Sequence, residues 1–278
     1  MSTLTMLDPP PLPVGWPVER IDTAHPHAAR VEDYLLSGKD NYQIDRDAAE
    51  AVLADFPQMR QIAAANRAFL RRAVHTLVAD GIEQFLDVGT GLPDHEHPAE
   101  TIHALCPGAR VVLADNNPVV LTHAAARLRG PQPQRTAVIE ADLREPAAIL
   151  DHPALRSVLD LDHPVGLLLG FVVHFLADHD HPADQIKTLI NALAPGSALV
   201  LSHATAEGQS HLARAAAEHY HDAGIPITLR TPAQIARFFD GLELLEPGLV
   251  AQPWWRPDED PTEDPGLNWG YSAVARKP

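Results

Sequence analysis

The residues FLDVGTGLP, numbers 85–93, decide which fold this chain adopts. The first half is apolar apart from one aspartate, as in a strand buried inside a sheet, and the second half is a glycine-rich turn. A strand that runs directly into such a turn lets main chain approach a ligand closely. The stretch therefore predicts an α/β fold with a ligand site at the carboxyl end of this strand.

Short apolar runs alternate with helical patterns from this stretch onward. The five runs are EQFLDVG, ARVVLADN, RTAVIEAD, HPVGLLLGFVV and SALVLSHAT. This alternation predicts βα units and a parallel sheet. Two later runs, LELLEPGLVAQPWW and NWGYSAVARK, predict two more strands that form a terminal antiparallel hairpin. The chain therefore reads as a Rossmann-like α/β protein with a seven-stranded, mostly parallel sheet.

The residues before the first strand carry helical patterns instead. DRDAAEAVLADF and QMRQIAAANRAFLRRAVHTLVAD place apolar residues at helical spacing, and Gly81 follows where a helix would end. We expect residues 1–80 to form an extended lead-in and a helical cap, and residues 81–278 to form the core of the same structural unit. Asn117–Pro118 and Thr231–Pro232 each predict a helix start, since Asn and Thr cap helices and Pro suits the first turn.

Charge and composition indicate a small ligand. The 278 residues carry a net charge of −16 without a basic stripe, so binding to nucleic acid or to an anionic membrane is disfavoured. The longest apolar run is too short to span a bilayer. One cysteine, Cys106, cannot form an internal disulfide, and the first residues do not resemble a signal peptide. We expect a cytoplasmic protein, and the sequence does not indicate its oligomeric state.

The turn after the first strand does not suit a phosphate. A dinucleotide fingerprint needs a third small residue, and Asp94 stands at that position, where its charge would repel phosphate. Pro93 also prevents a helix from starting at once, and the chain has no Walker lysine. A ligand with a nucleoside and an amino-acid end but no phosphate fits better. S-adenosylmethionine is such a ligand.

Three acids follow three successive predicted strands. Asp87 would lie under the glycine turn, Asp115 would accept from both ribose hydroxyls, and Asp142 would accept from the adenine amine, with Leu143 against the ring. A single aspartate after a strand is more often a helix cap or turn former, but three in this order favour a shared site. Further cofactor contacts are expected from Gly89, Thr90, Gly91, Asn116, Gly170 and Phe171.

Several segments resemble the actinobacterial S-adenosyl methyltransferases, a family once described as a domain of unknown function. They are ARVEDYLLSGKDNYQIDRDAAE, NRAFLRRAV, FLDVGTGLP, VVLADNNPVVLTHA, ADLREP and TPAQIARFFDGLELLEPGLV. The resemblance implies the class I methyltransferase fold and S-adenosylmethionine as cofactor, with motif positions at Asp87, Gly89, Gly91, Asp115 and Asp142. Where family members read GTGLPT, this chain reads GTGLPDHEHPAE.

The same resemblance implies that residues 34–42, YLLSGKDNY, form part of a cap over the cofactor. Turn formers interrupt two helices there and leave Lys39, Asn41 and Tyr42 able to face a cleft, although an ordinary turn between helices is the alternative. Arg67 is a candidate for the methionyl carboxylate because guanidinium pairs well with carboxylate. A surface salt bridge is the alternative for Arg67.

Methyl transfer from a sulfonium is an in-line displacement, so a general base is optional. His174 and His203, after the fourth and fifth strands, are the candidate catalytic bases, although most of the sixteen histidines are expected to be structural. DHEH and DHDH lack the helical histidine spacing of a metal site, and no metal is expected. The sequence predicts methyl transfer to a small-molecule acceptor. The alternatives are a regulatory protein that binds the cofactor without transferase activity and, less favoured, a nicotinamide oxidoreductase.

Overall fold

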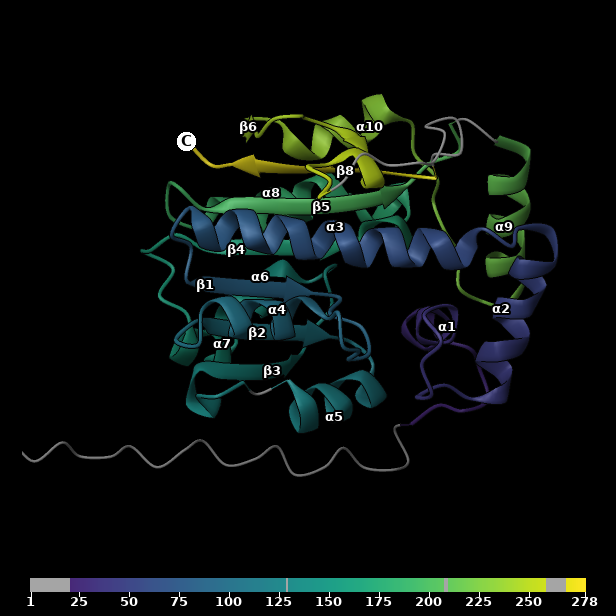
Figure 1. Cartoon of the computed structure of the whole chain (residues 1–278), viewed down its shortest axis with the longest axis horizontal. Coiled ribbons are helices and arrows are strands. Elements are labelled where there is room, and N and C mark those ends of the chain that lie inside the picture. Colours follow the sequence, from purple (N-terminus) through teal and green to yellow (C-terminus); the bar gives the residue numbers. More distant parts are fainter. Residues whose placement is uncertain (1–20, 129, 208–209, 259–268) are drawn as a thin grey trace, which may run out of the picture.

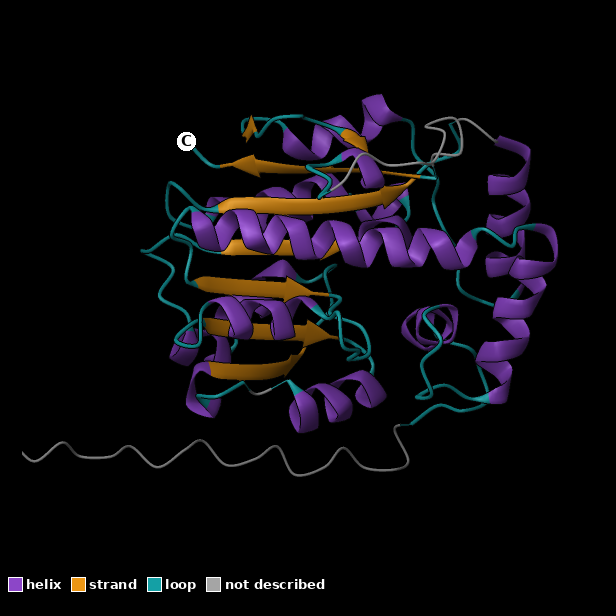
Figure 2. Cartoon of the chain, viewed as in Figure 1, coloured by secondary structure: helices purple, strands orange, loops and turns teal. Residues whose placement is uncertain are grey.

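A mixed sheet with helices on both faces forms the centre of the molecule (Figure 2). The computed structural model of the chain describes residues 21–128, 130–207, 210–258 and 269–278. In these residues the sheet has eight strands in the order β3-β2-β1-β4-β5-β8-β6, with β7 paired to β8. The strands are β1 (Gln84–Val88), β2 (Arg110–Asp115), β3 (Thr136–Glu140), β4 (Gly166–Gly170), β5 (Ala198–Ala204), β6 (Glu243–Leu244), β7 (Val250–Ala251) and β8 (Gly270–Arg276).

The first five strands are parallel, as the βα alternation predicts. Every residue of β1 is buried, which explains why the central strands read as continuous apolar runs. The strand order reverses between β1 and β4, and ligands of doubly wound sheets bind in the crevice at such a point.

The carboxyl-terminal strands are antiparallel, as expected, but the first of the two expected strands is divided. Both β6 and β7 pair with β8, which itself lies against β5. Pro247 and Gly248 lie between β6 and β7, where proline offers no ladder N–H and Gly248 has φ of 86°. The sheet therefore has one short strand more than the seven predicted.

Two groups of helices cover the two faces of the sheet. Apolar residues of α3, α4 and α5 pack on one face, and those of α6, α7 and α8 pack on the other (Figure 1). The α-helices are α1 (Ala28–Leu35), α2 (Gln43–Asp55), α3 (Met59–Ala79), α4 (Pro98–Leu105), α5 (Pro118–Arg127), α6 (Pro146–Asp151), α7 (Pro153–Val158), α8 (Pro182–Asn191), α9 (Ser210–Asp222) and α10 (Pro232–Ala236). The short 3-10 helices are η2 (Pro133–Arg135), η3 (Val173–Phe175), η4 (Asp178–Asp180), η5 (Arg237–Phe239) and η6 (Gln252–Trp254).

Helices α1, α2 and α9 stand beyond the carboxyl ends of the parallel strands (Figure 1). They share an apolar cluster of their own, in which Val31, Phe56 and Tyr220 are buried. Helix α9, from late in the chain, thus packs with helices from its start, whereas α3 runs along the sheet. The extended lead-in expected at the amino terminus, residues 1–20, lies outside the described residues.

Local capping explains several helix starts. Asn117 accepts from the Val119 amide at the start of α5, and Thr231 accepts from the Gln234 amide at the start of α10, which confirms both predicted starts. Among the described helices, none is both long and apolar enough to cross a bilayer.

Candidate cofactor site and an adjoining cavity

The turn after β1 presents main chain to a cavity. Gly89 and Gly91 have φ of 73° and 72°, a region that favours glycine. The amides of Gly89 and Thr90 donate to the Ala114 carbonyl at 2.8 and 3.2 Å, which fixes the turn against β2. A Cβ on Gly89 would lie 2.4 Å from Cγ2 of Val172, so no side chain fits there.

A cavity of about 320 Å³, called here the cofactor cavity, lies at the carboxyl ends of β1 to β4. The amino-terminal part of α1 and the residues after α9 close it from the other side. The sequence-predicted residues that line the cofactor cavity are Gly89, Gly91, Asp115, Asn116, Asp142, Leu143, Gly170 and Phe171. The structure therefore brings together the ends of the strands that the sequence singled out.

Asp87 lies under the turn and does not line the cofactor cavity. Its carboxylate accepts from the Thr90 hydroxyl at 2.7 Å, so Asp87 and Thr90 hold the turn from behind. Burial raises the pKa of Asp87 to about 6, against the opposing effects of the Thr90 hydrogen bond and Arg67.

Asp115 faces the cofactor cavity from the end of β2. One oxygen accepts from the Gly91 amide at 3.1 Å and the other from the Asn117 amide at 2.9 Å. Each oxygen keeps a lone pair, so both can still accept from a pair of vicinal hydroxyls. Burial raises the pKa of Asp115 to about 6, although these amide hydrogen bonds lower it.

Asp142 is held in place at the end of β3. Arg144 donates to its two oxygens through Nε and Nη2 at 2.9 and 2.6 Å, and Asn116 donates at 3.1 Å. These hydrogen bonds, of which the one from the Arg144 side chain has the largest effect, lower the pKa of Asp142 to about 2. The carboxylate therefore stays ionised as an acceptor, beside the buried side chain of Leu143.

Arg67, the candidate for the methionyl carboxylate, has acidic partners within the protein. Its side chain is buried and does not line the cofactor cavity. Nε donates to Asp94 at 3.0 Å, and Nη2 lies 3.8 Å from Glu32. Asp94 stands at the point where this chain departs from GTGLPT, and it engages the guanidinium that was expected to bind the methionyl carboxylate. The pair is buried rather than on the surface, so Arg67 does not form the surface salt bridge that was the alternative. Its binding to the methionyl carboxylate stays a prediction.

The turn at residues 39–42, which was expected to contact the cofactor, is hydrogen-bonded to α1 instead. Asp33 accepts from the Asp40 amide at 2.9 Å and from Asn41 Nδ2 at 2.7 Å, which closes the turn on itself. Lys39 and Tyr42 are exposed, and neither they nor Asn41 line the cofactor cavity. The segment is a turn between helices, and α1 supplies the contact to the cavity instead.

Both ring nitrogens of His203 have partners within the protein. Its Nδ1 lies 2.7 Å from the Ala204 carbonyl, which can only accept, so Nδ1 carries the proton and Nε2 accepts from Arg230 at 2.8 Å. Burial lowers the pKa of His203 to about 3. Because both nitrogens are engaged and His203 lines neither cavity described here, we no longer regard it as a candidate base.

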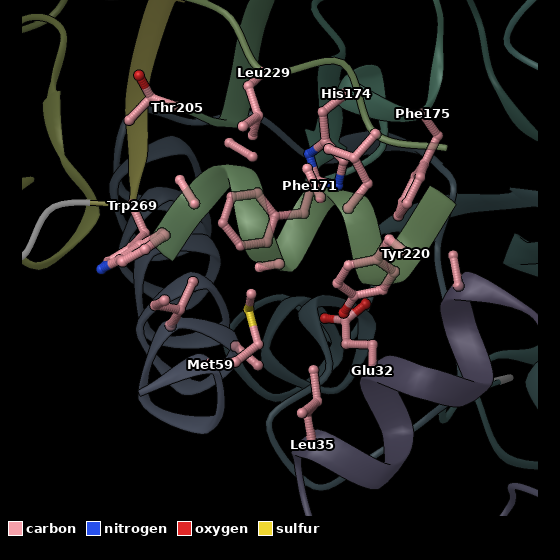
Figure 3. Close-up of a pocket in the computed structure, with 18 residues that line it drawn as sticks. Glu32, Leu35, Met59, Phe171, His174, Phe175, Thr205, Tyr220, Leu229 and Trp269 are labelled. Carbon is pink, nitrogen blue, oxygen red and sulfur yellow. The ribbon is translucent and has the colours of Figure 1, made fainter. Parts of the chain in front are cut away.

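A second cavity of about 90 Å³, called here the apolar cavity, lies between α1, α3, α9 and η3 (Figure 3). Phe171, Phe175, Tyr220 and Trp269 supply aromatic rings to its wall. His174 also lines it, with Nδ1 buried and without a hydrogen-bond partner. Burial lowers the pKa of His174 well below its usual value.

The two cavities share part of their walls. Ala28 and Glu32 from α1, and Phe171 and Phe175 from the segment after β4, line both of them. Phe171 has a φ of 51°, which is uncommon for an aromatic residue and places its ring at this junction. A reactive group held in the cofactor cavity near this junction would face the apolar cavity.

Sequence reasoning missed Glu32 and His97. Glu32 is a carboxylate on a helix face that otherwise carries Ala28 and Leu35, a spacing that could have marked it. His97 donates through Nε2 to the Thr90 carbonyl at 2.9 Å and caps α4 by accepting from the Ala99 amide. The His-Pro pair at the start of α4 carries the same signal as Asn117–Pro118.

The two His-Asp motifs serve as structural elements. In DHEH, Asp94 pairs with Arg67 and His97 caps a helix. In DHDH, Asp178 pairs with Arg230 at 2.7 Å. Across the described ranges, no three His, Cys, Asp or Glu side chains gather as a metal site.

Comparisons with known proteins concern the family and fold of the chain. A family model described as S-adenosyl methyltransferase matches residues 14–278. A DUF574 family protein from Streptomyces avermitilis is 41% identical, with a TM-score of 0.89 over 93% of this chain and 100% of its own. A candidate methyltransferase from Thermobifida fusca is 37% identical, with a TM-score of 0.87 over 94% of this chain and 98% of its own.

More distant structures share only the fold. The magnesium protoporphyrin IX methyltransferase of Synechocystis, solved with bound S-adenosylhomocysteine, is 16% identical, with a TM-score of 0.52 over 89% of this chain and 98% of its own. No curated protein matches the chain.

Proposed function

Because the chain belongs to the S-adenosyl methyltransferase family and is an S-adenosylmethionine-dependent methyltransferase, we propose that it methylates a small, largely apolar molecule bound in the apolar cavity. Membership of this family sets aside the oxidoreductase and the non-catalytic binding protein as alternatives. Its acceptor is the part of the function that we infer from the cavities.

The residues of the cofactor cavity fit S-adenosylmethionine. Asp115 would hold the ribose hydroxyls, and Asp142 with Leu143 would hold the adenine ring. Gly89 and Gly91 offer main chain to the methionyl part, next to α1. When bound, S-adenosylmethionine supplies a methyl group on a sulfonium, which needs no further activation. The protein has to position the acceptor and exclude water.

Charge at the methionyl end also fits this cofactor. Glu32, Asp87, Asp94 and Asp115 interact electrostatically with one another or with the single guanidinium of Arg67. Negative charge therefore exceeds positive charge here. S-adenosylmethionine carries an ammonium, a carboxylate and a sulfonium, with a net charge of +1. This excess of acids attracts it.

The proposal that the acceptor binds in the apolar cavity rests on one feature, the wall that the two cavities share. The methyl-bearing end of the cofactor would lie near Glu32 and Phe171, which face both cavities. Beyond them the lining is aliphatic and aromatic, with Met59, Ile62 and Leu229 among its members. Apolar walls would exclude water from the transfer and would favour an apolar acceptor.

A bulky residue in the apolar cavity tests this proposal. Ala217 on α9 lines the cavity, and Ala217→Phe would fill it, whereas Ala215 on the same helix does not line it and serves as the matched control. Each variant receives methyl-labelled S-adenosylmethionine and a fractionated actinobacterial extract. We expect label in the small-molecule fraction for the wild type and for Ala215→Phe, and its loss for Ala217→Phe with S-adenosylhomocysteine affinity retained.

Two results would contradict the proposal. Label that enters only the protein or nucleic-acid fraction would mean that the acceptor is not a small molecule. Undiminished labelling by Ala217→Phe would mean that the acceptor binds outside the apolar cavity.

A further inference from the structure

Glu32 is the only acid among the described residues that line the apolar cavity. It projects from α1, and its carboxylate points toward the hydroxyl end of Tyr220 on the opposite wall (Figure 3). Glu32 also lines the cofactor cavity, whereas His174 and Tyr220 line the apolar cavity alone. Its carboxylate is thus the ionisable group placed between cofactor and acceptor.

One oxygen of Glu32 has no hydrogen-bond partner. Oε1 is buried, and the nearest cation, Nη2 of Arg67, lies 3.8 Å away, beyond hydrogen-bonding distance. Arg67 already donates to Asp94. A buried carboxylate oxygen without a donor is costly, so a donor from a bound molecule is the expected partner.

The electrostatic surroundings make Glu32 a stronger base than an exposed glutamate. Burial raises the pKa of Glu32, Asp94 and Asp33 raise it further, and Arg67 opposes them. Burial and the charge of Glu32 raise the pKa of Tyr220, so its hydroxyl stays protonated and can donate. His174 differs, because burial lowers its pKa and weakens it as a base.

The surroundings also restrict the class of acceptor. The aromatic rings of the wall, among them Phe171, Phe175 and Tyr220, favour a planar aromatic body. We propose, on the basis of the function proposed above, that the acceptor is a phenol and that Glu32 takes the proton of its hydroxyl group during methyl transfer.

A phenol fits better than an amine or an alkyl alcohol. An alkyl amine would be a protonated ammonium beside Glu32, and its nitrogen would have no free electron pair for attack. A phenol is neutral, and with a pKa near 10, as for tyrosine, it loses its proton to a carboxylate far more readily than an alkyl alcohol does.

The transfer balances in atoms and charge. The phenol oxygen forms a bond to the methyl carbon while its proton passes to a carboxylate oxygen of Glu32. The bond between that carbon and sulfur breaks, and its electron pair stays on sulfur. The products are a methyl ether, neutral S-adenosylhomocysteine thioether and a protonated Glu32, which returns its proton to solvent.

The test measures hydroxyl recognition in the complex with S-adenosylhomocysteine. Phenols of increasing size, from phenol to 2-naphthol, are titrated by calorimetry, each beside its own methyl ether. We expect at least one phenol to bind ten times more tightly than its ether. Glu32→Gln should reduce that ratio to threefold or less while S-adenosylhomocysteine affinity stays within threefold. Glu83→Gln, an exposed glutamate at the opposite end of the sheet, is the control for loss of charge.

Turnover of the preferred phenol gives a second measurement. We expect methyl ether from the wild type, and a kcat about 100-fold lower in Glu32→Gln with KM within threefold. A wild type that binds the phenol but forms no ether, or a Glu32→Gln variant with wild-type kcat, would overturn the role of Glu32.

The binding results separate this proposal from the function on which it rests. Equal binding of phenol and ether would overturn the role of Glu32 but leave an apolar acceptor in place. Loss of S-adenosylhomocysteine affinity in Glu32→Gln would assign Glu32 to the cofactor instead. Absence of binding by every member of the series would contradict the apolar cavity as an acceptor site.

Discussion

Arg67 donates to Asp94 across 3.0 Å, and this ion pair joins the middle of α3 to the loop that follows the glycine turn. The two side chains are only 5% and 20% exposed. The buried guanidinium of Arg67 thus holds the first loop against α3. The cofactor cavity is consequently lined by acids and main chain on this side, and the loop geometry depends on Asp94.

Asp94→Ala should lower the free energy of unfolding by about 1.5 to 3 kcal/mol, because a hydrogen bond to a buried charge is lost. Glu96→Ala is the matched control, since Glu96 pairs at 3.0 Å with Arg71, one turn along α3, and both partners are more than a third exposed. It should cost at most about 1 kcal/mol. Urea titrations measure both, and equal costs would show that the Arg67 pair is no stronger than an exposed one.

Asp115→Ala should weaken S-adenosylhomocysteine binding by about 1.5 to 3 kcal/mol, roughly 10- to 150-fold, because the acceptor of the ribose hydroxyls is removed. Calorimetry measures the affinity, and circular dichroism checks the fold, since Asp115 also holds the Gly91 and Asn117 amides. Wild-type affinity in a folded variant would mean that another residue binds the ribose.

Gly89→Ala should destabilise the protein more than Gly81→Ala. Both glycines have positive φ, at 73° and 86°, so each variant has a left-handed alanine that costs about 1 to 2 kcal/mol. Only at Gly89 would the new Cβ meet a neighbour, Val172, whereas the space around Gly81 is open. Thermal unfolding and S-adenosylhomocysteine titration compare them. Identical melting temperatures would mean that Val172 moves aside without cost.

Local signals in the sequence predicted the parallel half of the sheet and the strand ends that form the cofactor cavity. Each βα unit has its own apolar run and cap, and parallel strands bring their carboxyl ends to one edge. Asp115 and Asp142 could therefore be identified without knowledge of the rest of the chain. The division between cap and core at residue 80 stays a prediction.

Contacts between distant segments could not be predicted in the same way. Arg67 and Asp94 are 27 residues apart, and only packing of α3 on the sheet decides that they meet rather than face the cofactor. Glu32 and Tyr220 come from α1 and α9, which share a cluster that no local pattern indicates. His203 lies within β5, one residue before its end, rather than after the strand, and Arg230, from a loop, engages its second nitrogen.

The affinity for S-adenosylmethionine should fall as the pH decreases through about 6. Burial raises the pKa of both Asp87 and Asp115 to about 6 without ligand, so below that pH they are increasingly protonated. The cofactor, with a net charge of +1, favours their ionised forms, and binding then requires proton release. Affinity should be constant above pH 7 and decline below 6 by up to about tenfold per pH unit for each proton released. Calorimetry at pH 5.0, 6.0 and 7.5 tests this, and Asp115→Asn should reduce the slope. Equal affinity at all three values would show that neither carboxyl group changes its protonation when the cofactor binds.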